Sequence, residues 1–295
     1  MPPGILRTQL SAFRNSDALK ELCALLGVDR RRLGEVYNLR AAADGSVRET
    51  QELRPLAALE RHRDALYPLI RELGFLDINK PLRVEHSHLL ILGGSLDACY
   101  SRTAAAAAWA TPAIRFIDGL SCYRPVHPAE RGASAFSPAC DTEFGVLSAA
   151  MTSIFRLTEP EDDFHGDRNL NRISCIRRFH GGDSSRSCRV FAAPSTQPEQ
   201  RRADTGDSFL FYLRHTELQA SDSILAVTNN RYCNRQFLQL VYHLLREECP
   251  AKLDVIGCTP DAAVVSPARY DPLQFLQDLA GILDWIDRLE PLLRE

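Results

Sequence analysis

From residue 86 onward, short apolar runs alternate with longer stretches in which apolar residues have helical spacing. The strand-like runs are His88–Leu92, Ala113–Asp118, Arg189–Ala193, Ser223–Thr228 and Leu253–Ile256. The helical stretches are Leu96–Trp109, Phe144–Leu157, Asp204–Leu218, Arg231–Glu248 and Pro272–Leu289. Strands that alternate with helices are typical of a parallel sheet, so the pattern predicts an α/β fold with a mainly parallel sheet of about five strands.

Residues 1–80 lack this alternation and are expected to be helical. A helix is predicted after Ser16, which can cap it, and before Gly27, which can end it. A second helical pattern of apolar residues covers 50–73. We therefore expect a helical N-terminal extension that packs on an α/β domain formed by residues 81–295.

The segment 158–186 interrupts the α/β pattern. It is polar and irregular, with one strand-like piece at Ile173–Phe179, and it is rich in Arg and His. The sequence leaves three interpretations open, which are a solvated loop, a lid over an anionic substrate and a basic hairpin that touches RNA. The acidic residues Glu159–Asp163, directly before the Arg- and His-rich part Phe164–Arg189, argue against nucleic acid.

Composition narrows the class of protein. The chain has 295 residues, 45% of them hydrophobic and 25% charged, which is typical of a folded globular protein. A net charge of −3 disfavours a basic nucleic-acid-binding domain. Nine dispersed cysteines without a CxxC pair indicate a reducing cytoplasm rather than a disulfide scaffold. Neither a signal peptide nor a run long enough to span a membrane is visible, so we expect a cytoplasmic protein.

Candidate binding residues follow the first two predicted strands. Ligands of open parallel sheets bind beyond the carboxyl ends of the strands. Gly93, Gly94 and Ser95 come directly after the first strand and can bring backbone N–H groups close to an anion at a helix N-terminus. Arg102 in the next helix and Arg124 in the loop 120–131 can pair with the same anion, although a solvated surface position is the simpler interpretation of each arginine.

Further polar residues occur where later strands end and helices begin. They are Glu143, the group Asp204, Thr205 and Asp207, and the group Thr228, Asn229 and Arg235. Glu143 and Asp207 are the candidates for a general base or for positioning water. Both also have a structural explanation, because Glu143 suits a helix dipole and Asp207 can complete a capping box with Asp204.

Taken together, these motifs resemble the YdcF/SanA/ElyC-like family, a Rossmann-like α/β group. The matching residues lie within about 86–258 and are Gly93, Gly94, Arg102, Glu143, Asp204, Thr205, Asp207, Thr228, Asn229 and Arg235. The chain differs from the family pattern at Ser95, where a third Gly is frequent, and at Tyr232–Asn234, where His and Pro are frequent. The resemblance implies a Rossmann-like three-layer sandwich, and it implies S-adenosylmethionine binding in the branch without a membrane anchor.

Other chemistries have weaker support in the sequence. Ser95 does not lie in the GxSxG pattern of α/β-hydrolases. His86 and His88 have no HExxH motif or third ligand nearby, so no metal site is predicted. Cys233 lies between Arg231 and Arg235, which can favour a thiolate, but an idle thiol is the simpler interpretation.

The sequence therefore predicts a protein that binds a nucleotide-like or phosphorylated small molecule, such as a nucleotide or S-adenosylmethionine, at the strand ends. It would be a hydrolase or a group transferase. Two alternatives stay open: a non-catalytic ligand sensor or scaffold, and a transferase acting on an aminoacyl-tRNA-like carrier. Membrane partners are not expected, and RNA is not excluded.

Overall fold

The computed structural model describes residues 3–37, 57–76, 79–134, 136, 139–167, 169–180, 186–258 and 271–294. The start of the predicted helix at 50–73, together with Arg168 and residues 181–185 of the Arg-rich segment, lies outside them. Within the described part of the chain, every helix is too short or too polar to cross a lipid bilayer.

Contacts divide the chain into two compact units, which we describe separately. The α/β unit comprises Lys80–Asn229 and His243–Thr259, and the helical unit comprises Met1–Asn79, Asn230–Tyr242 and Pro260–Glu295. One division falls between Asn79 and Lys80. The two later segments of the helical unit lie within the range that the sequence analysis assigned to the α/β domain.

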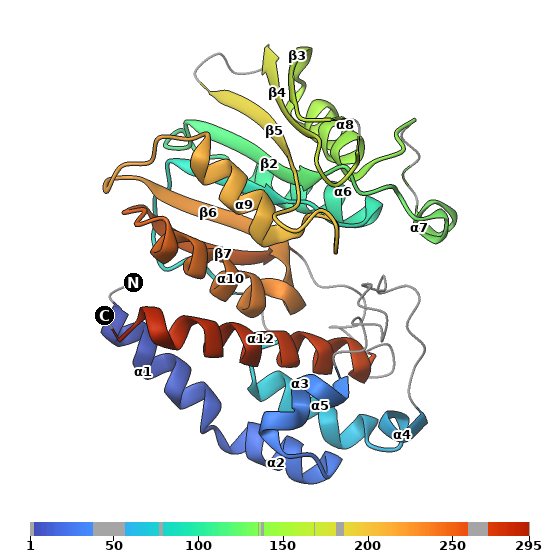
Figure 1. Cartoon of the computed structure of the whole chain (residues 1–295), viewed down its shortest axis with the longest axis vertical. Coiled ribbons are helices and arrows are strands. Elements are labelled where there is room, and N and C mark those ends of the chain that lie inside the picture. Colours follow the sequence, from blue (N-terminus) through green and yellow to red (C-terminus); the bar gives the residue numbers. More distant parts are fainter. Residues whose placement is uncertain are drawn as a thin grey trace. The chain divides into compact units, whose positions relative to one another are not determined.

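The α/β unit contains one seven-stranded mixed sheet (Figure 1). Its strands are β1 (His88–Leu92), β2 (Phe116–Cys122), β3 (Thr158–His165), β4 (Ser174–His180), β5 (Ser187–Ala193), β6 (Ser223–Asn229) and β7 (Lys252–Cys258). The order across the sheet is β3-β4-β5-β2-β1-β6-β7. The pairs β5–β2, β2–β1, β1–β6 and β6–β7 are parallel, which confirms the predicted α/β class with a mostly parallel sheet.

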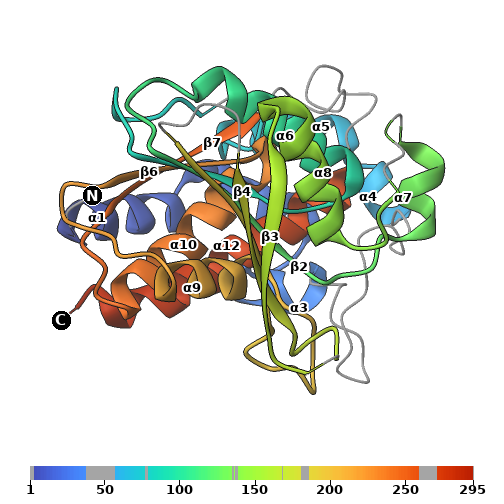
Figure 2. The same ribbon diagram turned by 90° about the horizontal axis from the view of Figure 1, so that it is seen from above.

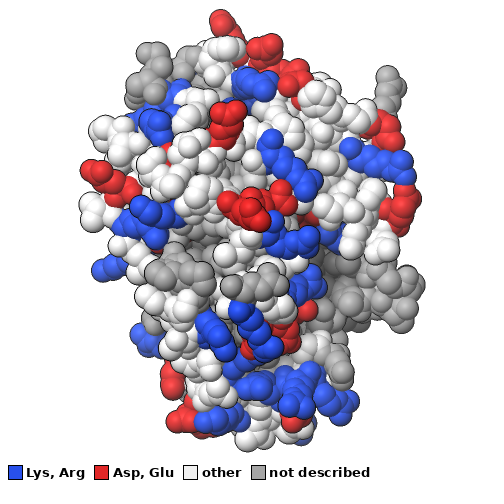
Figure 3. All heavy atoms as spheres, turned by 60° about the vertical axis from the view of Figure 1, so that its left-hand side comes forward, with Lys and Arg blue, Asp and Glu red and all other residues white. Residues whose placement is uncertain are grey.

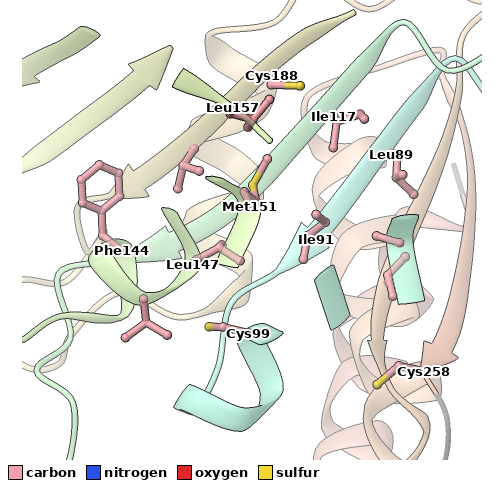
Figure 4. Packing of buried hydrophobic residues seen from close by; sticks show 14 of the residues in the cluster. Leu89, Ile91, Cys99, Ile117, Phe144, Leu147, Met151, Leu157, Cys188 and Cys258 are labelled. Atoms are coloured by element: carbon pink, nitrogen blue, oxygen red, sulfur yellow. The ribbon is translucent and has the colours of Figure 1, made fainter. Parts of the chain in front are cut away.

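Helices lie on both faces of this sheet (Figure 2). They are α6 (Leu96–Trp109), α8 (Glu143–Phe155) and α9 (Thr205–Arg214), and the short helix α7 (Pro128–Ala133) lies beside α6. On one face, Leu89, Ile91 and Ile117 of the sheet pack with Leu147 and Met151 of α8 in a buried hydrophobic cluster (Figure 4). The alternation of side chains along a strand sends the intervening residues to the other face.

That other face carries α9 and a set of buried aromatic and polar groups. The rings of Phe191 and Tyr212 meet edge to face with centroids 5.5 Å apart. The hydroxyl of Tyr212 hydrogen-bonds Nδ1 of His88 at 2.8 Å. Asp118, which has no exposed surface, accepts two hydrogen bonds from Arg189 at 2.8 and 2.9 Å. Asp118 and Arg189 are register partners, so this ion pair links β2 to β5.

The second strand differs from its predicted position. The sequence pattern placed it at Ala113–Asp118 with Gly119 as its end, whereas β2 covers Phe116–Cys122. Gly119 lies in the middle of the strand because Leu147 and Met151 leave no room for a side chain there: a Cβ would come within 2.9 Å of each. The glycine is therefore a packing residue and not a turn residue.

The segment 158–186 is not an irregular loop, and the expectation of one strand within it was incomplete. β3 and β4 form an antiparallel hairpin that extends the sheet beside β5. Cross-strand charges stabilise it, since Arg177 donates two hydrogen bonds of 2.6 Å to Asp162. Because β3 is mostly exposed, it lacks the apolar alternation that would have indicated a strand.

The helical unit contains the N-terminal helices, part of α10 and the last helix. Its elements are α1 (Pro3–Arg14), α2 (Asp17–Leu26), η1 (Arg30–Arg32), α3 (Leu33–Tyr37), α4 (Ala57–Glu60), α5 (Arg63–Glu72), η3 (Asn230–Tyr232), the first ten residues of α10 (Cys233–Arg246) and α12 (Pro272–Leu292). Ser16 caps α2, and Gly27 ends it with a φ of 64°, as the sequence predicted.

Candidate functional site

The Gly93–Gly94 pair lies at the carboxyl end of β1, where two side chains approach its backbone. A Cβ on Gly93 would lie 2.7 Å from the carbonyl oxygen of Leu120 and even closer to the carboxylate of Glu143. A Cβ on Gly94 would lie 3.1 Å from Nη1 of Arg102. Neither glycine has a positive φ, so close approach and not backbone conformation accounts for glycine at Gly93, while at Gly94 a Cβ would need a shift of only a few tenths of an ångström in its neighbours.

Arg102 projects from α6 toward the ends of two neighbouring strands. Its guanidinium donates from Nε to Oδ1 of Asn229 at 2.6 Å and from Nη1 to the carbonyl of Leu92 at 2.7 Å. It also donates to the carbonyl oxygen of Gly93. With 2% of its surface exposed, Arg102 is not the solvated arginine that the simpler interpretation expected. It fixes the end of β6 to the end of β1.

Arg124 follows β2 and connects two acidic residues to the same backbone. Its Nε donates to Oε2 of Glu143 at 3.1 Å, its Nη1 to Oε1 of Glu130 at 2.7 Å, and its Nη2 to the carbonyl of Gly94 at 2.8 Å. Arg124 is 7% exposed. Burial opposes its charge, but the carboxylates of Glu143 and Glu130 outweigh burial and raise the pKa of the guanidinium. Arg124 therefore remains a buried cation.

Glu143 is the first residue of α8, and Thr142 caps that helix through a hydrogen bond from the N–H of Gly145 at 3.2 Å. The backbone N–H of Glu143 donates to the carbonyl of Arg124 at 2.8 Å, which fixes the carboxylate over Gly93. Gly93, Gly94, Arg102, Arg124, Glu143 and Asn229 thus form one connected group. It joins the ends of β1, β2 and β6 to the starts of α6 and α8.

Ser95 and two thiols lie near this group without an activating partner. Ser95 is the N-cap of α6, but its side chain makes no capping hydrogen bond. Burial raises the pKa of Cys99 and of Cys122 to about 12, and the nearby Glu143 carboxylate contributes in the same direction. Both cysteines are therefore neutral thiols at physiological pH and are poor nucleophiles.

Thr228 and Asn229 end β6 on opposite faces of the sheet. Asn229 is on the α6 face, where it contacts Arg102. The alternation of the strand places Thr228 on the other face. Thr228 is fully buried, and its hydroxyl has no hydrogen-bond partner within the part of the chain that the structure describes.

The Asp204–Asp207 motif forms the start of α9. Asp204 accepts hydrogen bonds from the N–H groups of Gly206 and Asp207, and Asp207 accepts from the N–H of Asp204, so the predicted capping box is present. Thr205 is the first residue of the helix. Asp207 also accepts from Oγ1 of Thr196 at 2.6 Å and from both terminal nitrogens of Arg201.

Those donors determine the ionisation of Asp207. Burial favours its neutral form, but the hydrogen bonds from Arg201 and Thr196 prevail and lower its pKa. A carboxylate that accepts from so many groups has little capacity left to take a proton from a substrate. In this structure Asp207 holds the β5–α9 connection.

Arg235 belongs to the helical unit, which is described apart from the sheet. Its Nε donates to Oδ1 of Asp278 on α12 at 2.8 Å. A Cβ on Gly281 would come within 2.6 Å of Cδ of Arg235, so α12 carries a glycine where this arginine packs. Within its own unit, Arg235 connects α10 to the last helix.

Glu130 and Arg201, two charged residues beside the proposed catalytic candidates, are not among the sequence candidates. Glu130 pairs with Arg124, and Arg201 pairs with Asp207. Glu130 is in the first turn of the short helix α7, where an acidic residue is ordinary, and Arg201 follows a polar loop. Neither position carries a motif, so the sequence offered no signal for them.

The two histidines weighed as metal ligands lie at the opposite end of the parallel strands. His86 contacts Oδ2 of Asp254 at 3.0 Å, and His88 contacts Tyr212. Among the described residues, no three His, Cys, Asp or Glu side chains are grouped so that they could hold a metal ion.

Comparisons with known proteins identify distant relatives only. No family model matches the chain, and no solved structure matches it. It is 28% identical over 176 residues to the uncharacterized protein Rv3785 of Mycobacterium tuberculosis (strain ATCC 25618 / H37Rv) and to the uncharacterized protein Mb3814 of Mycobacterium bovis. The match covers 56% of this chain and 48% of each relative, so the chain spans about half the length of the curated relatives that it matches.

Proposed function

We propose that the α/β unit binds a small molecule with an anionic group, nucleotide-like or phosphorylated, at the carboxyl ends of β1, β2 and β6. One observation carries this proposal. Polar residues from three strand ends and two helices form a single connected group around Gly93 and Gly94, and its charged members Arg102, Arg124 and Glu143 are buried. A group of charged residues at the carboxyl ends of parallel strands is typical of a ligand site.

The order of the parallel strands supports a Rossmann-like fold for this unit. From β1 the chain proceeds outward through β2 to β5 and then returns across β1 to β6 and β7. If these five strands are numbered in chain order, their sequence across the sheet is 3-2-1-4-5, with the reversal between β1 and β6. Ligands of doubly wound sheets bind at that reversal, and Arg102 joins those two strand ends.

The resemblance to the YdcF/SanA/ElyC-like family enters the proposal at the same residues. Gly93, Gly94, Arg102, Glu143 and Asn229, which are matching positions of that family, belong to the connected group. Of the other matching positions, Asp204, Thr205 and Asp207 form the start of α9 and Arg235 belongs to the helical unit. Thr228 is buried on the opposite face of β6. A nucleotide and S-adenosylmethionine are therefore the first ligands to test.

For chemistry, Glu143 is the residue that we propose as general base of a hydrolase or group transferase. Its carboxylate lies directly against Gly93, where a ligand that approaches the glycine backbone would meet it. Arg102 and Arg124 would stabilise negative charge on the ligand. The contacts of Asp207 support a positioning role at the start of α9 instead of the catalytic role first expected.

A non-catalytic ligand sensor is the second candidate. The observation in its favour is that Glu143 is paired with Arg124 and that Cys99 and Cys122 have pKa values of about 12. Among these groups of the described site, no activated nucleophile stands out. On the face drawn in Figure 3, acidic and basic side chains alternate over the α/β unit, which gives an RNA carrier less support there than a small ligand.

We also propose a cytoplasmic location. The nine cysteines are not joined by disulfides, and a protein of this size in an oxidising compartment commonly carries disulfides.

A thermal-shift panel of nucleotides, S-adenosylmethionine and sugar phosphates tests the proposal. A ligand at 100 times its dissociation constant should stabilise the wild-type protein by about 2.7 kcal/mol. Arg102→Lys, which keeps the charge but loses the fork of donors, should reduce that stabilisation severely. Arg178→Gln on the exposed hairpin is the matched control and should respond as wild type. No shift with any ligand, or an equal shift in Arg102→Lys, would contradict the site.

A further inference from the structure

Glu130 is an acidic side chain buried among groups that suit an anionic ligand. It is 7% exposed although it belongs to α7, a helix of only six residues. Oε2 accepts a hydrogen bond from the N–H of Leu96, the first residue of α6, at 3.1 Å. The same carboxylate accepts from Nη1 and Nη2 of Arg124 at 2.7 and 3.3 Å.

These donors form the arrangement that binds a carboxylate or a phosphate group. An N–H at the start of a helix of 14 residues and the two terminal nitrogens of a buried guanidinium converge on one pair of oxygens. The guanidinium comes from the loop after β2 and the N–H from the loop after β1. The subsite is therefore assembled by the sheet and does not depend on α7.

The remaining contacts of α7 with α6 are peripheral. Ser134, the C-cap of α7, donates its hydroxyl to the carboxylate of Asp97. The rings of Phe136 and Tyr100 stack with centroids 4.1 Å apart, and Phe136 remains 42% exposed. Apart from Glu130, these contacts hold α7 and the residues after it at the surface of the α/β unit, where Figure 1 shows α7 within the connection between β2 and α8.

The base of that connection is fixed independently of α7. The N–H of Val126 donates to the carbonyl of Asp141 at 2.9 Å, and the N–H of Glu143 donates to the carbonyl of Arg124 at 2.8 Å. These bonds bring the two ends of the connection together, beside the single bridge between Pro125 and Thr142. Because Arg124 and Glu143 lie on this base, α7 can move away while both keep their positions.

We propose that Glu130 is an internal competitor that occupies the subsite for the ligand's anionic group, and that the ligand must displace α7 to bind. This inference rests on the proposed function and adds the regulation of the same site. A state with Glu130 in place cannot accept a phosphate or carboxylate on the same N–H groups. The measured affinity is then the intrinsic affinity reduced by the fraction of molecules with the subsite vacant.

Inorganic phosphate is the probe for this inference, because it tests the anion subsite without the rest of a ligand. The phosphate dissociation constant is measured by calorimetry for the wild type, Glu130→Ala and Glu161→Ala. Glu161→Ala is the control, because it also removes one carboxylate. Glu161 lies on the exposed strand β3, which is distant from the subsite in the sequence and in the order of strands across the sheet. Glu130→Ala should bind phosphate at least about tenfold more tightly than the other two.

Hydrogen exchange provides a second measurement that does not need a variant. The N–H of Ser134 bonds to the carbonyl of Glu130 at 3.1 Å within α7. Saturating phosphate should accelerate exchange of α7 amides in the wild-type protein, because α7 leaves its place on α6. Strand β1 should show no acceleration.

The outcomes separate this inference from the proposed function. Equal phosphate affinity in wild type and Glu130→Ala, or no phosphate binding by Glu130→Ala at millimolar concentration, would overturn the internal competitor. If the larger ligands still bind and depend on Arg102, the proposed function stands without it. If Glu130→Ala binds phosphate tightly and the larger ligands fail, the subsite and its competitor stand, and the nucleotide-like ligand is wrong.

Discussion

The substitution Gly93→Ala tests whether the glycine pair is required by packing. The added methyl group would lie 2.7 Å from the carbonyl oxygen of Leu120 and would also meet the carboxylate of Glu143. The carboxylate can rotate away, but the carbonyl belongs to β2. The N–H of Gly93 donates to that same carbonyl at 2.6 Å, and β1 pairs with β2 along its whole length, so the backbone has little freedom to move.

Two opposing effects determine the magnitude. Overpacking costs about 1–3 kcal/mol, whereas Ala in place of Gly stabilises by about 0.4–1 kcal/mol when φ is ordinary. Gly93 has an ordinary φ, so the net loss in the free energy of unfolding should be about 1–2 kcal/mol. With an m-value of about 3 kcal/mol/M, the urea midpoint should fall by about 0.3–0.7 M.

Urea unfolding followed by circular dichroism measures this loss. The control is Gly34→Ala, because a Cβ on Gly34 meets nothing within 4 Å and lies in helix α3. This control should stabilise slightly. If Gly93→Ala were as stable as Gly34→Ala, the close packing of Glu143 and Leu120 on Gly93 would be refuted.

Three further predictions concern buried groups of the α/β unit. Burial lowers the pKa of His88 from 6.5 to about 4. The neutral side chain therefore makes its full contribution to stability above pH 6.5, and this contribution decreases by up to about 3 kcal/mol as the pH falls toward 4. His88→Gln should flatten that part of a stability–pH curve, and an unchanged slope would contradict the assignment. Arg189→Met should lower the free energy of unfolding by about 3–5 kcal/mol in chemical denaturation, because it leaves Asp118 as an unpaired buried carboxylate. Adding Asp118→Asn should recover much of that loss. If the losses of the two single variants simply added in the double variant, the ion pair would be contradicted. Cys99 and Cys122, with pKa values of about 12, should resist iodoacetamide in the native protein at about pH 8, and rapid alkylation seen by mass spectrometry would show that they are accessible or activated.

The sequence could predict those site residues that stand at or just after the end of a strand. Gly93, Gly94 and Asn229 follow or end strands with clear apolar patterns, and Arg102 lies two turns into the next helix. In a parallel sheet those positions converge at one edge. The structure brings these four residues together with Arg124 and Glu143, as expected from that rule.

The rule about strand ends could not predict contacts between segments that are distant in the sequence. Arg235 follows a strand end but pairs with Asp278 on α12, and nothing in the local sequence of α10 indicates that partner. Glu130 is an ordinary acid in the first turn of α7 until Arg124 and the start of α6 are seen around it. Both cases depend on tertiary packing.

The β3–β4 hairpin shows a second limit. Strands are recognised by apolar alternation, which reflects burial of one face. β3 has acidic residues on an exposed edge and pairs with arginines of β4 instead. A segment stabilised by cross-strand charges therefore lacks the usual pattern of a strand. The predicted position of β2 was wrong for a related reason. Asp118 and Gly119 resemble the end of a strand in the sequence, but in the structure they are buried inside β2.

Hydrogen exchange with and without a bound ligand shows most directly whether a ligand binds at the carboxyl ends of β1, β2 and β6. The ligand with the largest thermal shift is added at saturation, and exchange is measured along the chain by mass spectrometry. Protection from exchange is expected at the start of α6, from Gly93 to Tyr100, and at the end of β6 around Asn229. Protection confined to the amino ends of the strands, around His88, would contradict the site, and so would protection confined to the helical unit.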